Sequence, residues 1–458
     1  MSGHGPTENS DAGARSGRGS LLRSLAAIGP GIVVAGSVIG SGELVNTPVQ
    51  AAKFGFVLLW VVLLSCVIKF FLQIEIARHC LVHNRTTIQA LNTCPGPRLG
   101  GTSWTALLYM LGYFATMLTV VGIIGALGGL MHGLWPLASA PVTSTRIWGA
   151  LMVGLAIAVL WQGWYRHLET LVMVLVGIFS ISVGVGVLLI QGTPFRISAD
   201  ELLSGLTFSL GADRQAAAFA VISLMGALGV AANELFMYPY WVLEKGYARE
   251  LGDPTSAGWS ERARYWIRTI WLDAGLSTAL ATVVTAAFFL LGAAVLQEAV
   301  PEGVEVVDQI SRVYTESYGA WSKWPFMIGA FCTLFSTLVV IAAASGRMWA
   351  DLFGSFGLLD IRDPNAARGC HQIVQTVWLC GLLAGFLLME KPPADLIAAG
   401  HFILGAFMTP LLMFAICWLA FHTDQRVRMG RLTAAALLTS MVVILACVFA
   451  NLYIQMSG

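Results

Sequence analysis

The sequence predicts an all-α integral membrane protein with about eleven transmembrane helices. Of its 458 residues, 57% are hydrophobic and only 11% are charged, whereas a soluble domain carries about twice that share of charge. The charged residues lie in clusters between apolar runs, and these runs are long enough to cross ~30 Å of hydrocarbon as helices. The gaps between runs are too short for a folded soluble domain. We therefore expect a single transmembrane domain over residues 23–458, preceded by a disordered cytoplasmic tail at residues 1–22.

The basic residues predict the orientation of the chain. An odd number of spans places the two termini on opposite sides of the membrane. With the N-terminus in the cytoplasm, eighteen Lys and Arg residues fall in inner segments and seven in outer segments, as the positive-inside rule requires. We expect the bacterial inner (plasma) membrane, with the N-terminus cytoplasmic and the C-terminus outside. The expected spans are roughly 25–50, 56–77, 104–132, 147–163, 170–192, 217–243, 268–296, 324–346, 372–389, 395–420 and 432–455.

The first span contains residues that do not suit a continuous helix facing lipid. Gly40, Ser41, Gly42 and Glu43 stand near its middle. A glycine costs about 1 kcal/mol relative to alanine in a helix interior, and a carboxylate at the membrane centre costs at least ~2.5 kcal/mol. These residues therefore predict an unwound segment that lines a cavity.

The sixth span repeats this pattern. Glycines at 226 and 229 precede Asn233 and Glu234, and Pro239 follows them. If spans 1–5 and 6–10 are inverted repeats, spans 1 and 6 are counterparts, and matching interruptions in counterparts indicate a transport site. The alternative is that the glycines only permit close helix packing and that the acids are neutral or paired. The expected substrate-binding set is Gly40, Ser41, Gly42, Glu43, Asn233 and Glu234.

Two further charged residues are candidates for gating or coupling. Lys69 lies midway along span 2, where an ammonium group needs a partner or a water-filled cavity. Glu75 is at an unsuitable helical angle to be that partner. Both a buried ion pair with another helix and a gating role stay open for Lys69. Asp273 lies near the start of span 7, where an interfacial charge is the simpler interpretation and a gate is the alternative.

Several stretches together resemble the Nramp (natural resistance-associated macrophage protein) family of divalent-metal transporters. The resemblance extends over nearly the whole chain after residue 25, and it implies ten helices in two inverted repeats of five plus an eleventh, the fold of the amino acid–polyamine–organocation superfamily. The stretches are Gly29-Pro30-Gly31, Phe54-Gly55-Phe56-Val57-Leu58-Leu59-Trp60, Gln73, Ala77-Arg78, Leu168-Glu169, Gly226-Ala227 with Asn233, and Ala344-Ser345-Gly346.

The chain departs from that family at the metal-binding motifs. The family has Asp-Pro-Gly-Asn in span 1, where this chain has Gly40-Ser41-Gly42-Glu43, and Met-Pro-His-Asn in span 6, where it has Val230-Ala231-Ala232-Asn233. The sulfur ligand that favours Mn, Fe or Cd is missing, so a site with Glu43, Asn233 and Glu234 as metal ligands would suit a hard cation.

Other family features are also changed or open. The acids of the family's third span correspond to Met117 and Val120, so a proton relay in the family's manner cannot run through these positions. A polar residue from span 10 completes the metal shell in the family, which makes His401 and Thr409 further candidates for gating or coupling.

The leading hypothesis is a secondary transporter for a divalent cation of hard, Mg-like character. The alternative is a transporter of amino acids or related organic solutes, because Gly40-Ser41-Gly42 resembles the Gly-Ser-Gly motif that holds a substrate carboxylate in such transporters. An aromatic cluster at 236–241 would then bury the organic body, although interfacial anchoring is its simpler interpretation. No motif of a hydrolase or nucleotide-binding enzyme occurs. We expect a lipid bilayer and a small solute as partners, with no enzyme activity, cofactor, nucleic acid or protein partner.

Overall fold

The computed structural model describes residues 40–162, 165–229, 232–360 and 363–457. The predicted tail at 1–22 and the first part of span 1 lie outside these ranges. All of the other predicted spans coincide with helices, several of them interrupted. In chain order, the helices of the spans are η1 (Gly42–Asn46) with α3 (Thr47–Phe54), η2 (Gly55–Leu58) with α4 (Leu59–His83), α6 (Trp104–Tyr113) with α7 (Ala115–Leu134), α8 (Pro141–Gln162), α9 (Tyr165–Leu189) with η3 (Ile190–Gly192), α11 (Arg214–Leu224) with η4 (Met225–Gly229) and α12 (Ala232–Glu244), α14 (Trp259–Val295), α17 (Lys323–Ser355), α18 (Pro364–Leu388), α19 (Pro393–Ile403) with η6 (Leu404–Met408) and α20 (Thr409–Phe421), and α21 (Arg431–Ser457).

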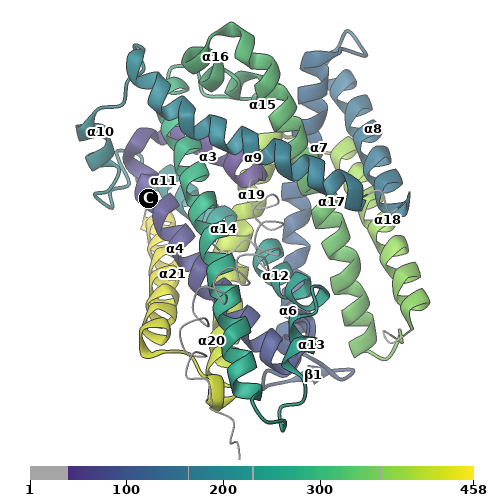
Figure 1. The fold of residues 1–458 in the computed structure, drawn as a ribbon. Coiled ribbons are helices and arrows are strands. Elements are labelled where there is room, and N and C mark those ends of the chain that lie inside the picture. The colour runs from purple at the N-terminus through teal and green to yellow at the C-terminus, as the bar shows by residue number, and fades with distance from the viewer. Residues whose placement is uncertain (1–39, 163–164, 230–231, 361–362, 458) are drawn as a thin grey trace, which may run out of the picture.

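Short elements occupy the two ends of the helical body. The end with α13 and the strands lies opposite the end with α10, α15 and α16 (Figure 1), and α21 runs from the first end toward the second. These elements are α5 (Thr87–Leu91), β1 (Arg98–Leu99) paired antiparallel with β2 (Thr102–Ser103), α10 (Ala199–Ser204), α13 (Tyr247–Leu251), α15 (Val306–Ile310), α16 (Arg312–Tyr318), η5 (Ala320–Ser322) and η7 (Gln425–Val427).

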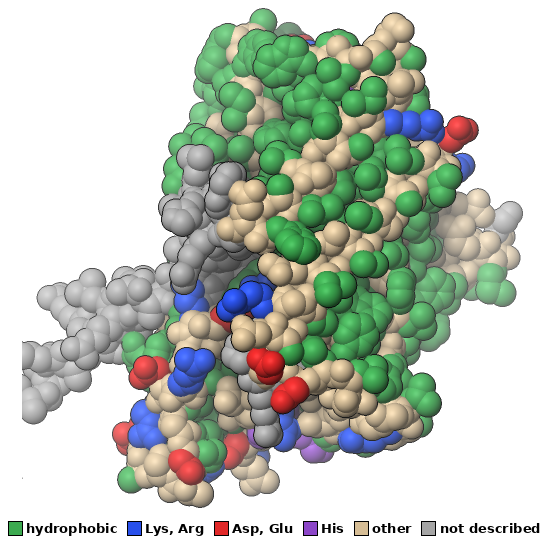
Figure 2. Space-filling view, turned by 90° about the vertical axis from the view of Figure 1, so that its right-hand side faces the viewer, with side chains coloured by type: hydrophobic (Ala, Val, Ile, Leu, Met, Phe, Trp, Pro, Cys, Tyr) green, Lys and Arg blue, Asp and Glu red, His purple; other side chains and the backbone are tan. Residues whose placement is uncertain are grey.

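Within the described ranges, nine helices are long and apolar enough to cross a membrane, and the longest of them joins η1 to α4 without a gap. The face formed around α8, α17 and α18 is hydrophobic over most of its height, and the charged side chains gather mainly toward its lower end (Figure 2). Several helices are longer than predicted: α4 continues to His83, α14 begins at Trp259 and α17 continues to Ser355. The reason is that helices continue into the polar ends of the body, where hydropathy no longer marks them.

The packing divides the spans into two groups that each draw on both halves of the chain. Helices α3 and α4 of spans 1 and 2 pack against α14 of span 7, and α4 also packs against η4 and α12 of span 6. Helices α7 and α8 of spans 3 and 4 pack against α17 and α18 of spans 8 and 9. Equivalent spans of the two halves therefore come together, which is the arrangement expected of inverted repeats. The predicted fold class is confirmed.

Candidate functional site

Span 1 is irregular at the predicted position. The described chain begins at Gly40, and η1 is a π-helix from Gly42 to Asn46 that leads into α3. The Gly40 amide donates to Oε2 of Glu43 at 2.8 Å, and Thr47 Oγ1 donates to the Gly42 carbonyl at 2.8 Å. The Glu43 carboxylate thus satisfies a backbone N–H directly before η1, and negative charge is favourable beside such free N–H groups.

Spans 6 and 10 carry the same kind of irregularity. In span 6, α11 passes into the π-helix η4, and α12 begins at Ala232. In span 10, the π-helix η6 separates α19 from α20. Single π-helical turns are uncommon and are often found at functional sites. The sequence analysis did not predict the irregularity of span 10, although Gly405 and Pro410 were signals for it.

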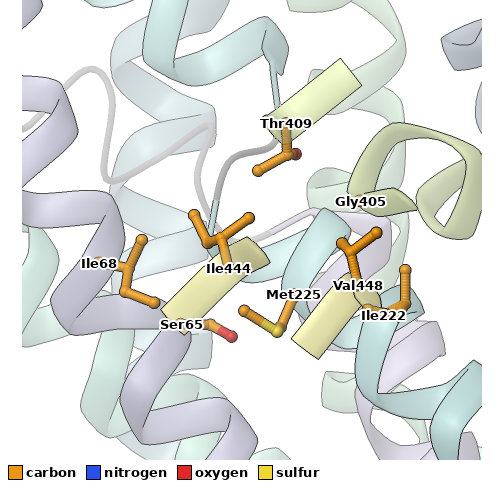
Figure 3. A pocket seen from close by; sticks show the side chains of 9 residues that line it. Ser65, Ile68, Ile222, Met225, Gly405, Thr409, Ile444 and Val448 are labelled. Atoms are coloured by element: carbon orange, nitrogen blue, oxygen red, sulfur yellow. The ribbon is translucent and has the colours of Figure 1, made fainter. Parts of the chain in front are cut away.

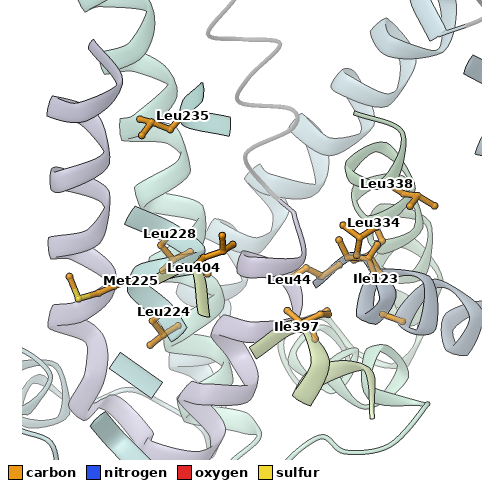
Figure 4. Close-up of a cluster of buried hydrophobic side chains, with 14 of the residues drawn as sticks. Leu44, Ile123, Leu224, Met225, Leu228, Leu235, Leu334, Leu338, Ile397 and Leu404 are labelled. Carbon is orange, nitrogen blue, oxygen red and sulfur yellow. The ribbon is translucent and has the colours of Figure 1, made fainter. Parts of the chain in front are cut away.

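The three irregular turns meet at small residues. A Cβ atom at Gly42 would lie 3.3 Å from Cβ of Ala227 in η4 and 3.8 Å from Cε1 of His401 in α19. A Cβ atom at Gly226 would overlap the His401 carbonyl oxygen and lie 2.8 Å from the Gly405 amide nitrogen. The glycines therefore let three helices approach closely. Each irregular turn also contributes a buried leucine, Leu44, Leu228 and Leu404, to a cluster of buried hydrophobic side chains (Figure 4).

A small cavity beside this junction contains charged groups, and we call it the charged cavity. Glu43 and Lys69 both line it, and each side chain is only 4% exposed. Its volume is about 10 Å³, which is room for about one water molecule or one bare ion. The lining residues are Glu43, Cys66, Lys69, Gln73, Leu228, Ser277, Thr278, Ala281 and Thr285.

Most polar lining residues of the charged cavity were missed by the sequence analysis. Cys66, Lys69 and Gln73 lie three and four residues apart on α4, and Ser277 and Thr285 lie eight apart on α14. Such spacing places side chains on one face of a helix. A polar stripe on one face of each of two apolar spans was the signal that could have found them.

A second cavity of about 10 Å³ lies on another face of α4, and we call it the apolar cavity. On α4 it is lined by Ser65 and Ile68, which directly precede Cys66 and Lys69 in the sequence. Ser65 and Thr409 each present a buried hydroxyl that has no hydrogen-bond partner among the described residues. Side chains of α4, α11, η4, α20 and α21 surround the space between them (Figure 3). The lining residues are Ser65, Ile68, Ile222, Met225, Gly229, Gly405, Thr409, Ile444 and Val448.

A polar path connects one hollow at the protein surface with the break in span 1. This hollow, of about 530 Å³, is lined by Gln50, Lys53, Lys391 and Asp395, among others, and we call it the lysine-lined hollow. Gln50 Nε2 donates to Asn46 Oδ1 at 3.3 Å, and Asn46 Nδ2 donates to Ser223 Oγ at 3.2 Å. Asn46 belongs to η1, so the path reaches the π-helical turn of Glu43.

A second hollow, of about 510 Å³, lies near α5 and the end of α17, and aromatic residues of α12 are connected to it through Asp351. The rings of Phe236 and Tyr109 are in contact at a tilt of 45°, with their centroids 4.5 Å apart. Tyr240 Oη donates to Asp351 Oδ2 at 2.5 Å, and Asp351 lines the hollow. Phe236, Tyr238 and Tyr240 are 0%, 0% and 6% exposed. The interpretation of the aromatic cluster as interfacial anchoring is therefore wrong for these three residues, because α12 packs inside the bundle.

The structure places the predicted candidates at different points. Gly42 and Glu43 lie at the junction, Gly40 and Ser41 directly precede it, and Lys69 shares the charged cavity with Glu43. Asn233 and Glu234 lie in the first turn of α12, but their side chains are outside the described part of the chain. Of the tentative metal ligands, only the Glu43 side chain is described. In the described ranges, no three His, Cys, Asp or Glu side chains form a group that could hold a metal ion.

The remaining candidates for gating or coupling lie at three different places in the structure. His401 lies beside Gly42 at the junction and is 6% exposed, whereas Thr409 lines the apolar cavity. Asp273 is 1% exposed and accepts a hydrogen bond from Tyr238 Oη at 2.8 Å. The side chain of Asp273 therefore lies inside the bundle, fourteen residues after α14 begins at Trp259, and both interpretations of its role stay predictions.

Comparisons with known proteins agree on one family. The family model described as "natural resistance-associated macrophage protein-like" (Nramp) matches residues 31–457. The divalent metal cation transporter MntH of Bradyrhizobium diazoefficiens is 23% identical over 95% of this chain and 89% of its own length. MntH of Brucella suis is 24% identical over 95% and 88%.

Solved structures show the same fold. A manganese transporter of Eremococcus coleocola superposes with a TM-score of 0.67 at 17% identity, covering 95% of this chain and 87% of that one. MhsT in complex with L-phenylalanine superposes with a TM-score of 0.56 at 17% identity, covering 92% and 98%. The same fold therefore occurs in one protein named for a metal and in another solved with an amino acid.

Proposed function

The chain belongs to the Nramp family, and on that premise we propose that it is a secondary transporter that moves a divalent cation of hard, Mg-like character by alternating access around the breaks in spans 1 and 6. The observation that carries the proposal is the Glu43 carboxylate, which is buried at the junction and lines the charged cavity. The names of the MntH relatives support cation transport.

The cavity chemistry supports the hard character of the ion. The groups beside Glu43 are the Gln73 amide and the hydroxyls of Ser277, Thr278 and Thr285. Oxygen donors of this kind suit Mg²⁺ or Ca²⁺ better than softer metals. Cys66 is the single sulfur among the lining residues of this cavity, and a neutral thiol is a weak ligand.

The access routes support alternating access. The lysine-lined hollow connects to η1 through the polar side chains of Gln50 and Asn46. The second hollow is lined by Asp351, which Tyr240 hydrogen-bonds, and the buried contact of Phe236 with Tyr109 one turn earlier on α12 would form the gate toward that hollow. Transport would require these rings to move apart while the first route closes.

Lys69 is the observation that favours the alternative, transport of an amino acid or a related organic solute. Its ammonium lines the same cavity as Glu43, and like charges repel a second cation in a region of low dielectric constant. Lys53 and Lys391 also line the lysine-lined hollow, against one carboxylate from Asp395. A zwitterionic amino acid would place its carboxylate near the Lys69 ammonium group and its amino group near the Glu43 carboxylate.

Isothermal titration of the purified full chain with Mg²⁺, Mn²⁺, Ca²⁺ and a panel of amino acids separates the two functions. The Glu43→Gln variant is titrated in parallel, and its amide keeps the size of the side chain. Heat from a divalent ion that disappears in the variant is the expected result, with Mg²⁺ binding at least as tightly as Mn²⁺. No response to any metal, together with a response to an amino acid, would overturn the cation proposal in favour of the alternative.

A further inference from the structure

Two histidines lie one turn apart near the end of α4, away from the charged cavity. His79 and His83 have ring centroids 4.5 Å apart. Two histidines at i and i+4 on a helix present their imidazoles on one face, which is the spacing with which a helix holds one metal ion. Gln73, the nearest lining residue of the charged cavity on α4, is six residues before His79, or about 9 Å along the helix axis.

The hydrogen bonds of His79 determine which of its ring nitrogens carries the proton. Nδ1 lies 2.9 Å from the Leu419 carbonyl oxygen and 3.1 Å from Thr423 Oγ1. The carbonyl can only accept, and Thr423 Oγ1 donates its own proton to the same carbonyl at 3.0 Å. Nδ1 of His79 must therefore be the donor, and in the neutral ring Nε2 carries a free lone pair. In metal-bound histidines, the ring nitrogen that does not bind the metal typically donates a hydrogen bond to a carbonyl or carboxylate oxygen.

The Nε2 atoms of this histidine pair have no hydrogen-bond partner in the described part of the chain. Nε2 of His79 and Nε2 of His83 are both buried there without a hydrogen bond. A buried polar atom without a partner is unfavourable, so a structure keeps few of them. His79 is 3% exposed, whereas His83 is half-buried and gives the pair an opening to the surface.

The charges around the pair are mixed. Asp424 is a charged neighbour of His83, and hydrogen bonds from Arg426 lower the pKa of this carboxyl and keep it ionised. Arg78 and Arg85 are positive neighbours, but Arg78 is paired with Glu75 at 2.6 Å. The nearby carboxylate therefore compensates in part for the arginines, and a cation can approach through His83.

The geometry points to a transition-metal site on Nε2 of His79 and Nε2 of His83, with water completing the coordination, that is separate from the substrate site. Imidazole nitrogens prefer metals such as Zn²⁺, Ni²⁺ or Cu²⁺ to Mg²⁺ or Ca²⁺. The ion held here would thus differ in class from the hard cation proposed for the charged cavity. Because His79 is hydrogen-bonded to α20, an ion on this pair would fix the end of α4 beside that helix.

Titration of the purified full chain with Zn²⁺ alone tests this site. The variants are His83→Gln, which removes one ligand at a half-buried position, Glu43→Gln, which alters the charged cavity, and His422→Gln as the matched control. His422 is an exposed histidine of the same region, stacked on Trp418 at 4.2 Å. We expect His83→Gln to weaken Zn²⁺ binding at least tenfold, while the other two variants bind Zn²⁺ as the unmodified chain does.

X-ray absorption at the zinc edge provides a second readout, with two imidazole nitrogens expected in the unmodified chain and fewer in His83→Gln. Unchanged Zn²⁺ affinity in His83→Gln, or no Zn²⁺ binding by the unmodified chain, would overturn the site. Equal loss in Glu43→Gln would also overturn it, because zinc would then bind in the charged cavity. Failure of the Mg²⁺ titration alone would contradict the proposed transport function and leave this result unaffected.

Discussion

The charged cavity and the apolar cavity are the same size and lie beside the same helix, yet their chemistry is opposite. Adjacent residues of α4 face the two spaces: Lys69 and Cys66 line one, and Ile68 and Ser65 line the other. Each cavity has a volume of about 10 Å³. The apolar cavity is bordered by α21, the helix of span 11. The charged cavity lies between α4, α14 and the irregular turns η1 and η4 of spans 1 and 6.

This difference in lining chemistry indicates that the charged cavity, unlike the apolar cavity, is more than a gap in helix packing. Burying a carboxylate and an ammonium costs several kcal/mol per ion even in a relaxed protein, so an imperfectly packed gap does not acquire such groups by chance. The apolar cavity carries only two hydroxyls without a partner, each of which costs about 1–3 kcal/mol, less than a buried ion. A small void occurs in many helical bundles, whereas a void lined by two charged side chains beside the irregular turns η1 and η4 supports the site that we propose.

The variant Lys69→Met gives the largest expected effect. It tests whether the positive charge of Lys69 weakens or supports substrate binding in the charged cavity. At an effective dielectric constant of about 20, removing one positive charge near a bound divalent cation relieves repulsion on the order of 3 kcal/mol, or about a hundredfold in affinity. Cation binding should therefore become tighter in isothermal titration. Ile68→Met is the control from the other face of α4 and should leave affinity unchanged. If the alternative function is correct, Lys69→Met instead loses amino acid binding.

The variant Glu43→Gln removes the opposite charge and should weaken divalent cation binding by about tenfold to a hundredfold, since hydrogen bonds and contacts to charged groups are worth about 1.5–3 kcal/mol. The control is Glu298→Gln, an exposed acid in the loop after α14. Uptake of the ion into liposomes should fall in the first variant and remain in the second. Equal effects of the two changes would mean that the site lies elsewhere.

The variant Gly226→Ala tests the junction that both cavities adjoin. The new Cβ would overlap the His401 carbonyl oxygen, and backbone atoms of another helix cannot move aside cheaply. We expect a loss of about 1–3 kcal/mol of stability, seen as a lower melting temperature in detergent. Gly381→Ala in α18 is the control, because a Cβ there meets nothing within 4 Å. The control should be neutral or slightly stabilising, since alanine is the better helix former.

The fold could be predicted from the sequence because each transmembrane helix leaves a hydropathy signal over a long stretch of residues. Each span contains about twenty mostly apolar residues, so an error of a few residues at a helix end did not change the number or order of the predicted spans. Glycines and an acid within an apolar run also located the irregular turn at Gly42 and Glu43, although the described residues form a π-helix there and not the predicted unwound segment. These signals arise from local composition, which a single sequence contains in full.

The composition of the site could be predicted only in part. Thr409 was a candidate for gating or coupling, but it follows the π-helical turn η6, which the sequence did not predict, and it lines the apolar cavity. Ser277 and Thr285 were missed because their role depends on how α14 packs against α4. Which faces of two helices meet is a tertiary property, and hydropathy along one span does not contain it.

The variant Ser65→Ala gives the smallest expected effect and tests whether the apolar cavity is only a packing gap. The Ser65 hydroxyl is buried without a partner among the described residues, so its removal should raise stability by about 1 kcal/mol and leave cation affinity unchanged. Ser277→Ala is the matched change in the charged cavity and should weaken cation binding instead. Thermal melting with and without the ion measures both properties in one experiment. If Ser65→Ala reduced the stabilisation by the ion as much as Ser277→Ala does, the two cavities would act as one site, and the contrast between the two faces of α4 would not hold.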